Sequence, residues 1–142
     1  MTQQEINKAN SRRAMLAVEK EDFATFVALA DPDFRLEAPG SPPLDQEGYQ
    51  GFCGMFNAAF PGFTHDLEDM IAEGDHVTRI GTFKGVHKGD FMGIPATGRP
   101  VSMDFISVDS YRRGKLVRIR INADMMGLMQ QLGPIPQTVA QE

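Results

Sequence analysis

Residues 99–123 read RPVSMDFISVDSYRRGKLVRIRINA. Apolar and polar side chains alternate on both sides of the turn Arg112-Arg113-Gly114-Lys115, a pattern typical of two antiparallel strands joined by a tight turn. In the second strand one face carries Val117, Ile119, Ile121 and Ala123, and the other carries Arg118, Arg120 and Asn122. We expect the apolar face to line the core, which turns both arginines outward to solvent or to a subunit interface.

The same alternation predicts two earlier strands, at about 63–72 and 75–86. Gly74 lies in the turn between them, and a long loop from Gly89 to Gly98 leads into the strand that starts near residue 99. Because these strands follow one another with turns between them, the sequence predicts a curved antiparallel sheet of four long strands in which sequence neighbours pair.

Helical spacing of apolar residues precedes the sheet. Residues 3–30 predict two helices that break near Lys20-Glu21-Asp22, with Asp22 capping the second helix and Asp31-Pro32-Asp33 ending it. A short strand at 34–37 and a third helix at 46–60 are expected next.

A closing helix is predicted after Asp124, because apolar residues recur at helical spacing until Gly133-Pro134. Helices, then a sheet, then a helix indicate an α+β fold, in which a strongly twisted sheet wraps around three N-terminal helices as a cone with a pocket at its open end. We expect one domain over residues 1–136 and a polar tail over 137–142.

The composition excludes several classes of partner. The 142-residue chain carries 14 basic and 19 acidic residues, and its net charge of −5 argues against binding nucleic acid or an anionic membrane. Cys53 is the only cysteine, so neither an intramolecular disulfide nor a cysteine zinc site can form. No apolar stretch approaches the roughly 20 residues of a membrane span, and we expect a cytoplasmic protein.

Five motifs resemble those of a known family. They are Phe60-Pro61-Gly62-Phe63, the hairpin AEGDHV at 72–77, the loop HKGDFMGIPATG at 87–98, Gly114-Lys115-Leu116, and DMMGLMQQLG at 124–133. Together they span most of the chain and are similar to the SnoaL-like polyketide cyclases, within the nuclear-transport-factor-like and ketosteroid-isomerase-like superfamily. The stretch 118–123 departs from the family, since many relatives carry a Glu-His-Trp-like sequence there.

The resemblance implies an α+β cone, usually dimeric or larger, with a ligand pocket between sheet and helices and no metal or organic cofactor. Its cyclases use acid/base chemistry. The family's catalytic carboxylate lies where the last strand meets the closing helix, which corresponds to Asp124, and a second polar group from the preceding strand corresponds roughly to Asp109.

Two readings of Asp124 follow from its position. In an apolar cavity its charged form would be disfavoured and it would serve as a general acid/base, whereas as the N-cap of the closing helix it would accept backbone N–H groups without catalysis. Asp109 shares a strand face with Ser107 at the expected pocket mouth, and it either holds the substrate or pairs with Arg112 or Arg113 in solvent.

The histidines differ in their expected surroundings. His65 shares an apolar strand face with Phe63 and is expected in the core or the pocket, and His76 is expected in an exposed turn. His87 ends a strand beside the long loop and is a candidate for proton transfer or for holding the substrate oxygen. Their spacing matches no metal-ligand pattern.

The expected ligand is an apolar small molecule with one or two oxygens at one end. Its candidate contacts, beyond those already named, are Tyr49, Phe52, Phe56, Ile119, Ile121 and Met125. Highly charged ligands are not expected because the register leaves no arginine facing inward. If the register of the last strand were reversed, Arg120 would enter the cavity and bind a carboxylate.

The sequence therefore predicts a cofactor-independent polyketide cyclase-type enzyme, and a homodimer joined through the outer face of the sheet. Asp124 would remove a proton next to a carbonyl, and Asp109 or His87 would hold the substrate oxygen while a carbon–carbon bond forms within the molecule. Two alternatives remain open: a non-catalytic binding module for small molecules, and an epoxide or lactone hydrolase in which Asp124 and Asp109 grip one water.

Overall fold

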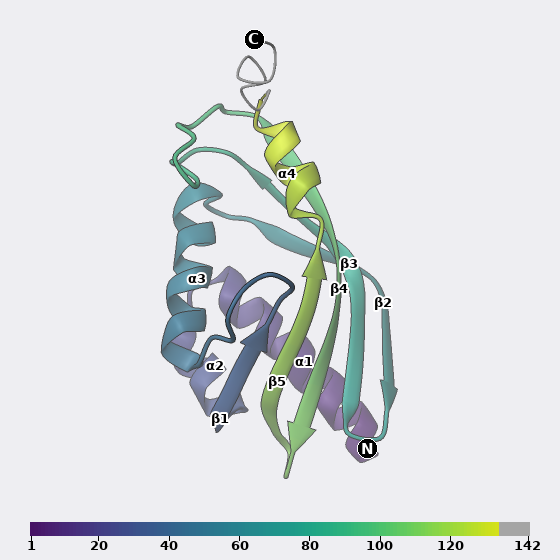
Figure 1. The fold of residues 1–142 in the computed structure, drawn as a ribbon. Helices are drawn as coiled ribbons and strands as arrows, with labels where there is room; N and C mark the ends of the chain where they lie inside the picture. The colour runs from purple at the N-terminus through teal and green to yellow at the C-terminus, as the bar shows by residue number, and fades with distance from the viewer. Residues whose placement is uncertain (134–142) are drawn as a thin grey trace.

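The computed structural model describes residues 1–133 and contains one curved five-stranded sheet, in the order β1-β5-β4-β3-β2 (Figure 1). The strands are β1 (Ala30–Glu37), β2 (Thr64–Glu73), β3 (His76–Val86), β4 (Pro100–Arg112) and β5 (Lys115–Ala123). Strands β2 to β5 pair with their sequence neighbours in antiparallel register, as the alternation predicted. The expected α+β fold is confirmed.

Four helices accompany the sheet, and three of them lie against one of its faces (Figure 1). They are α1 (Gln3–Glu19), α2 (Phe23–Leu29), α3 (Gln46–Ala59) and, beyond the end of β5, α4 (Met125–Gln131). Each begins at a side chain that accepts a backbone N–H, and these caps are Thr2, Asp22, Asp45 and Asp124. None of the helices in residues 1–133 is long and apolar enough to cross a membrane.

Strand β1 differs from the prediction in length and in partner. The expected strand at 34–37 begins at Ala30, directly after α2, and pairs in parallel with β5 so that Leu36 faces Ile119. Pro32 therefore lies within the strand, where it is tolerated because β1 is at the edge of the sheet. Local spacing could not reveal a pairing between segments about 80 residues apart.

A bulge in the β4–β5 hairpin corrects one predicted side-chain direction. Asp109 pairs with Ile119 but Tyr111 pairs with Leu116, so β5 has one extra residue between these two pairs. Leu116 is consequently buried and Val117 only half-buried, whereas the alternation placed Val117 in the core. Beyond the bulge the predicted register holds, because Ile119 is buried and Arg120 is exposed.

The core is rich in phenylalanine, and one of its rings comes from the long loop after β3. Phe91 is fully buried, and its ring centre lies 5.1 Å from those of Phe56 and Phe60 on or next to α3. The loop is closed by backbone hydrogen bonds between His87 and Arg99 and between Gly98 and His87. These bonds and the buried Phe91 ring hold the loop against the end of α3, while most of its other residues stay exposed.

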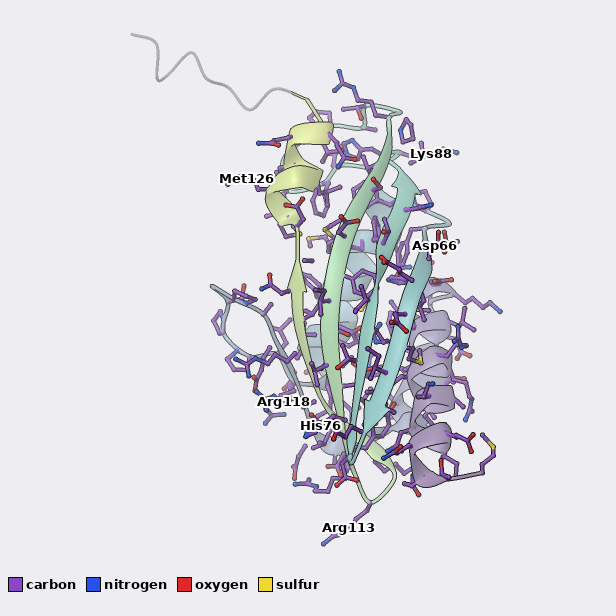
Figure 2. The ribbon with its side chains drawn as sticks, turned by 90° about the vertical axis from the view of Figure 1, so that its right-hand side faces the viewer. Asp66, His76, Lys88, Arg113, Arg118 and Met126 are labelled. Carbon is purple, nitrogen blue, oxygen red and sulfur yellow. The ribbon has the colours of Figure 1, made fainter. Side chains whose placement is uncertain are left out.

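The outer face of the sheet is open to solvent in the single chain. Figure 2 shows this side, with Arg113 at the tip of the β4–β5 hairpin and Met126 on α4 toward the other end. Ile71 and Ile106 are more than half exposed there, at 52% and 53%. The boundary predicted at residue 136 and the tail at 137–142 lie outside the described residues.

Candidate active site

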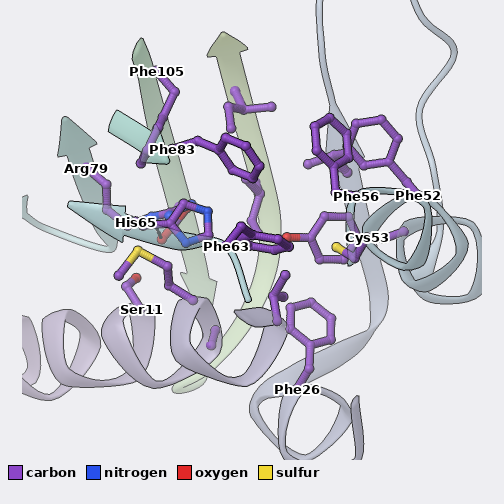
Figure 3. A pocket seen from close by; sticks show the side chains of 18 of the residues that line it. Ser11, Phe26, Phe52, Cys53, Phe56, Phe63, His65, Arg79, Phe83 and Phe105 are labelled. Atoms are coloured by element: carbon purple, nitrogen blue, oxygen red, sulfur yellow. Dashed lines mark hydrogen bonds and ion pairs between the residues drawn. The ribbon is translucent and has the colours of Figure 1, made fainter. Parts of the chain in front are cut away.

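A cavity of about 100 Å³ lies between the inner face of the sheet and helices α1, α2 and α3 (Figure 3). Most of its wall is aromatic or aliphatic, and six phenylalanines contribute to it: Phe26, Phe52, Phe56, Phe63, Phe83 and Phe105. Phe52 is 38% exposed, so the wall reaches solvent on the α3 side. Only a few polar side chains enter the cavity: Ser11, Tyr49, Cys53, His65, Arg79 and Asp109.

Arg79 and Asp109 form a buried ion pair in this cavity. The Arg79 Nε donates to Asp109 Oδ2 over 2.8 Å and Nη2 donates to Oδ1 over 3.1 Å, while the Ser107 hydroxyl donates to Oδ1 over 3.4 Å. The side chains are 7% and 2% exposed. Burial alone would lower the pKa of Arg79, but the adjacent carboxylate outweighs burial and raises it, so the guanidinium stays charged.

Two tyrosines lie near this pair. Tyr111 shares a 2.7 Å hydrogen bond with Ser11 of α1, and burial raises the pKa of its hydroxyl. Burial also raises the pKa of Tyr49 well above its usual range, with the neighbouring Cys53 adding to the effect. Both hydroxyls therefore stay protonated, and Tyr49 offers the cavity an uncharged donor.

His65 enters the cavity from the start of β2 and is held by Glu19 at the end of α1. Glu19 Oε2 lies 2.8 Å from the His65 Nδ1 and accepts the His65 backbone N–H at 2.8 Å. Because a carboxylate only accepts hydrogen bonds, Nδ1 carries the proton in this contact, and Nε2 of a neutral ring is left with a free lone pair.

The Phe105 ring contacts one member of each polar pair, His65 of the Glu19–His65 pair and Arg79 of the Arg79–Asp109 pair. Its centre lies 5.7 Å from the His65 ring centre and 5.8 Å from the Arg79 Cζ. Figure 3 shows Arg79, His65 and Phe105 on the sheet side of the cavity, with Phe52 and Phe56 on the α3 side. The charged groups thus lie at the sheet end of the cavity, while α3 contributes phenylalanine rings and the uncharged polar groups of Tyr49 and Cys53.

Most of the predicted ligand contacts line this cavity. Six of them are Tyr49, Phe52, Phe56, His65, Ile119 and Ile121, and the predicted catalytic residue Asp109 joins them. Ser107 is buried behind Asp109 and reaches the cavity only through that carboxylate. Arg120 is exposed, and it does not enter the cavity as the reversed register would require.

Asp124 and Met125 are not part of the cavity wall. Asp124 is exposed, and its carboxylate accepts the Gly127 backbone N–H over 2.9 Å at the start of α4. Met125 is half-buried against the core. The structure places Asp124 in the N-cap position that the sequence left open as its second reading, and it does not bring Asp124 and Asp109 onto one water.

His87 is fully buried, also outside the cavity wall. Its Nδ1 accepts the Thr97 backbone N–H at 3.2 Å and lies 3.0 Å from the Thr97 hydroxyl, while Nε2 has no hydrogen-bond partner in the described part of the chain. The ring packs 5.5 Å from that of Phe60. His87 therefore contacts the long loop and the phenylalanine core.

Sequence reasoning missed Arg79 and Glu19. Arg79 lies between Val77 and Phe83 on the inward face of β3, and it is buried. Strand alternation could have marked Arg79 as an inward residue. The statement that no arginine faces inward is therefore wrong. Glu19 belongs to a charged run at a helix end, and its contact with His65 spans 46 residues. No local signal marks that contact.

The described residues contain no group of three His, Cys, Asp or Glu side chains arranged to hold a metal ion. The paired groups in the cavity, an acid with a histidine and an acid with an arginine, are suited instead to moving a proton and to holding an oxygen.

The sequence profile of the SnoaL-like polyketide cyclases matches residues 9–132, a range that contains every residue of the cavity wall. The chain belongs to this family. A comparison with curated proteins found no match.

Solved structures share the fold over nearly the whole chain. A proposed SnoaL-like cyclase from Jannaschia sp. CCS1 is 19% identical with a TM-score of 0.87, and the match covers 96% of this chain and 97% of that one. AclR from Streptomyces galilaeus, a proposed hydroxylase, is 23% identical with a TM-score of 0.84, covering 94% and 99%. IdmH from Streptomyces antibioticus, a proposed polyketide cyclase, is 28% identical with a TM-score of 0.80, covering 90% and 99%.

Proposed function

We propose that this SnoaL-like protein is a cofactor-independent enzyme of the polyketide-cyclase type, acting on an apolar carbonyl compound in the cavity. The observation that carries the proposal is the histidine held by a carboxylate inside an apolar cavity, with His65 and Arg79 both against the Phe105 ring. The 28% identity to IdmH over 90% of the chain supports the same class of reaction.

In the proposed reaction, His65 Nε2 removes a proton from the carbon next to a carbonyl, and Glu19 stabilises the resulting imidazolium. The enolate oxygen accepts hydrogen bonds from the Arg79 guanidinium and the Tyr49 hydroxyl. The enolate carbon then attacks a second carbonyl of the same molecule, forming a carbon–carbon bond, and the imidazolium returns its proton to the new alkoxide. The phenylalanine wall excludes water that would otherwise reprotonate the enolate.

This assignment replaces two residues of the sequence prediction. Asp124 and His87 lie outside the cavity wall, so we give neither a part in proton transfer. Asp109 keeps a part, because it fixes the direction of the Arg79 guanidinium through two hydrogen bonds. The hydrolase alternative required Asp124 and Asp109 at one water, and it is disfavoured because Asp124 is exposed at the start of α4 while Asp109 is buried in the cavity wall.

The experiment measures the first step alone. 2-Tetralone, an uncharged two-ring ketone, exchanges its α-protons for deuterium in D₂O, and NMR follows the rate with and without protein. We expect the wild type to accelerate exchange, and His65→Gln to reduce the enzymatic rate by about 10²–10⁴. His76→Gln is the matched control, because His76 is exposed at the start of β3.

The same experiment separates the enzyme from a binding module. A wild-type protein that binds 2-tetralone without accelerating exchange is the result expected of a non-catalytic module, and it would refute the proposal. Full exchange activity in His65→Gln would refute the assignment of the base.

We further propose a homodimer joined through the outer face of the sheet, where Ile71, Ile80 and Ile106 form an apolar patch. Light scattering after size exclusion tests it, and a monomer of 15.7 kDa at micromolar concentration would refute it. The cytoplasmic location inferred from the composition stays a prediction.

A further inference from the structure

The charged groups around the cavity carry no net positive charge. Arg79 is the only lysine or arginine in the cavity wall formed by residues 1–133, and both of its short hydrogen bonds go to Asp109. Glu19 stands behind His65 as a second carboxylate. Whether His65 is neutral or protonated, the sum over these four groups is −1 or 0, so an anionic ligand meets no unpaired positive charge.

The remaining polar groups of the wall are uncharged. Burial raises the pKa of the Cys53 thiol to about 12, and burial keeps the Tyr49 hydroxyl protonated. Ser11 is engaged with the Tyr111 hydroxyl. Hydrogen bonds are therefore available to a ligand oxygen, but no group supplies the full countercharge that a carboxylate or phosphate needs after losing its water.

We propose that the Arg79–Asp109 ion pair makes the cavity selective for uncharged ligands bearing a carbonyl or hydroxyl oxygen, and that Asp109 is the residue that sets this selectivity. The inference rests on the proposed function only in placing the ligand in this cavity. It deepens that function by naming the substrate class as neutral ketones, esters and enols and by excluding their free carboxylic acids.

The reason lies in what Asp109 does to Arg79. A guanidinium facing an apolar cavity without a partner would bind carboxylates in a bidentate manner, as arginine does in most anion sites. Asp109 already occupies that position with two hydrogen bonds, and its burial keeps it from moving into solvent. An incoming carboxylate would have to compete with a covalently tethered one.

The test uses two matched probes, 2-naphthol and 2-naphthoate. They share a ring system, and only the second is charged at pH 7; 2-naphthol also has the skeleton of the enol of 2-tetralone. We expect the wild type to bind 2-naphthol at least about tenfold more tightly, and Asp109→Asn to reverse the order because it leaves Arg79 unpaired.

Two further variants assign the effect to this pair. Asp104→Asn removes an exposed carboxylate from the outward face of the same strand, and it should leave the preference for 2-naphthol unchanged. The double variant Arg79→Met with Asp109→Leu removes both charges, and it should bind 2-naphthol but not gain affinity for 2-naphthoate.

Asp109→Asn is expected to be less stable, and this loss provides a second readout. Because 2-naphthoate would supply the missing carboxylate, it should raise the melting temperature of Asp109→Asn more than that of the wild type, whereas 2-naphthol should not discriminate in this way. An equal shift by 2-naphthoate in both proteins would overturn the proposal.

The outcomes also separate this inference from the proposed function. Tight binding of 2-naphthoate by the wild type would overturn the selectivity and leave proton exchange on 2-tetralone untouched. A preference for 2-naphthol without exchange activity would support the selectivity and refute the enzyme. Failure of the wild type to bind either probe would refute both, since the cavity would not be a ligand site.

Discussion

Arg79 and Asp109 are diagonal neighbours on the inner face of the sheet, where the β3–β4 register pairs Arg79 with Ser107 and Asp109 with Val77. This offset lets the long arginine side chain meet the carboxylate in two parallel hydrogen bonds of 2.8 and 3.1 Å. Since both partners are buried on strands, the guanidinium is fixed in direction, and it offers a ligand oxygen a preorganised donor.

Breaking the Arg79–Asp109 pair should lower the free energy of unfolding far more than breaking a surface ion pair does. Arg79→Met leaves a buried unpaired carboxylate, and we expect the free energy of unfolding to fall by about 3–5 kcal/mol, measured by urea titration. Arg118→Met is the matched control, because Arg118 pairs with Glu37 near the surface, and its loss should stay within about 1 kcal/mol. Equal losses in the two variants would show that the Arg79 pair is not effectively buried.

Glu19 should act through His65 and not on the ligand directly. It is not in the cavity wall, so Glu19→Gln should lower kcat for 2-tetralone exchange and leave KM nearly unchanged, because the imidazolium loses its countercharge. An increase in KM with unchanged kcat would contradict the role of Glu19 in positioning the base.

Asp124 should matter for stability and not for the reaction. Asp124→Ala removes the N-cap of α4 and should destabilise the protein by about 0.5–2 kcal/mol, while Asp124→Asn should cost less because asparagine also caps helices well. Exchange of 2-tetralone protons should continue in both variants. A loss of exchange of a hundredfold or more in Asp124→Asn would restore the carboxylate to the catalytic role that the family resemblance implies.

The buried thiol gives a pH-dependent prediction. Burial raises the pKa of Cys53 from 9.0 to about 12, so the native protein should resist iodoacetamide at pH 8 and react readily once unfolded in urea. The thiol of the unfolded chain ionises at a lower pH than the buried thiol. The protonated Cys53 therefore contributes its full stabilisation of the fold below pH 9, and this contribution is lost as the pH rises toward 12. Rapid alkylation of the native protein would show that the thiol is not enclosed.

The regular part of the fold could be predicted because its signals are local. Strand alternation has a period of two residues, and it correctly predicted the antiparallel strands β2 to β5 and the outward direction of Arg120. The parallel pairing of β1 with β5 and the bulge at Val117 depend on contacts between distant segments, and neither leaves a mark in the spacing of apolar residues.

The sequence predicted most of the apolar contacts that line the cavity, but only some of its polar side chains. The apolar contacts on α3 and β5 follow from periodicity, and His65 and Asp109 follow from strand parity. Arg79 carried the same parity signal, but the expectation that no arginine faces inward considered only the arginines of the last strand. Glu19 carried none, because a carboxylate at a helix end is usually solvated, and only the packing of α1 on β2 brings it to His65.

A crystal structure of the wild type with 2-naphthol tests the central claim most directly. Our account predicts that the ligand oxygen lies within hydrogen-bond distance of Arg79 or Tyr49, and that the C1 carbon lies within about 3.5 Å of the His65 Nε2, as proton removal requires. A ligand bound outside the cavity, or one whose oxygen points toward Phe52 and away from Arg79, would contradict it.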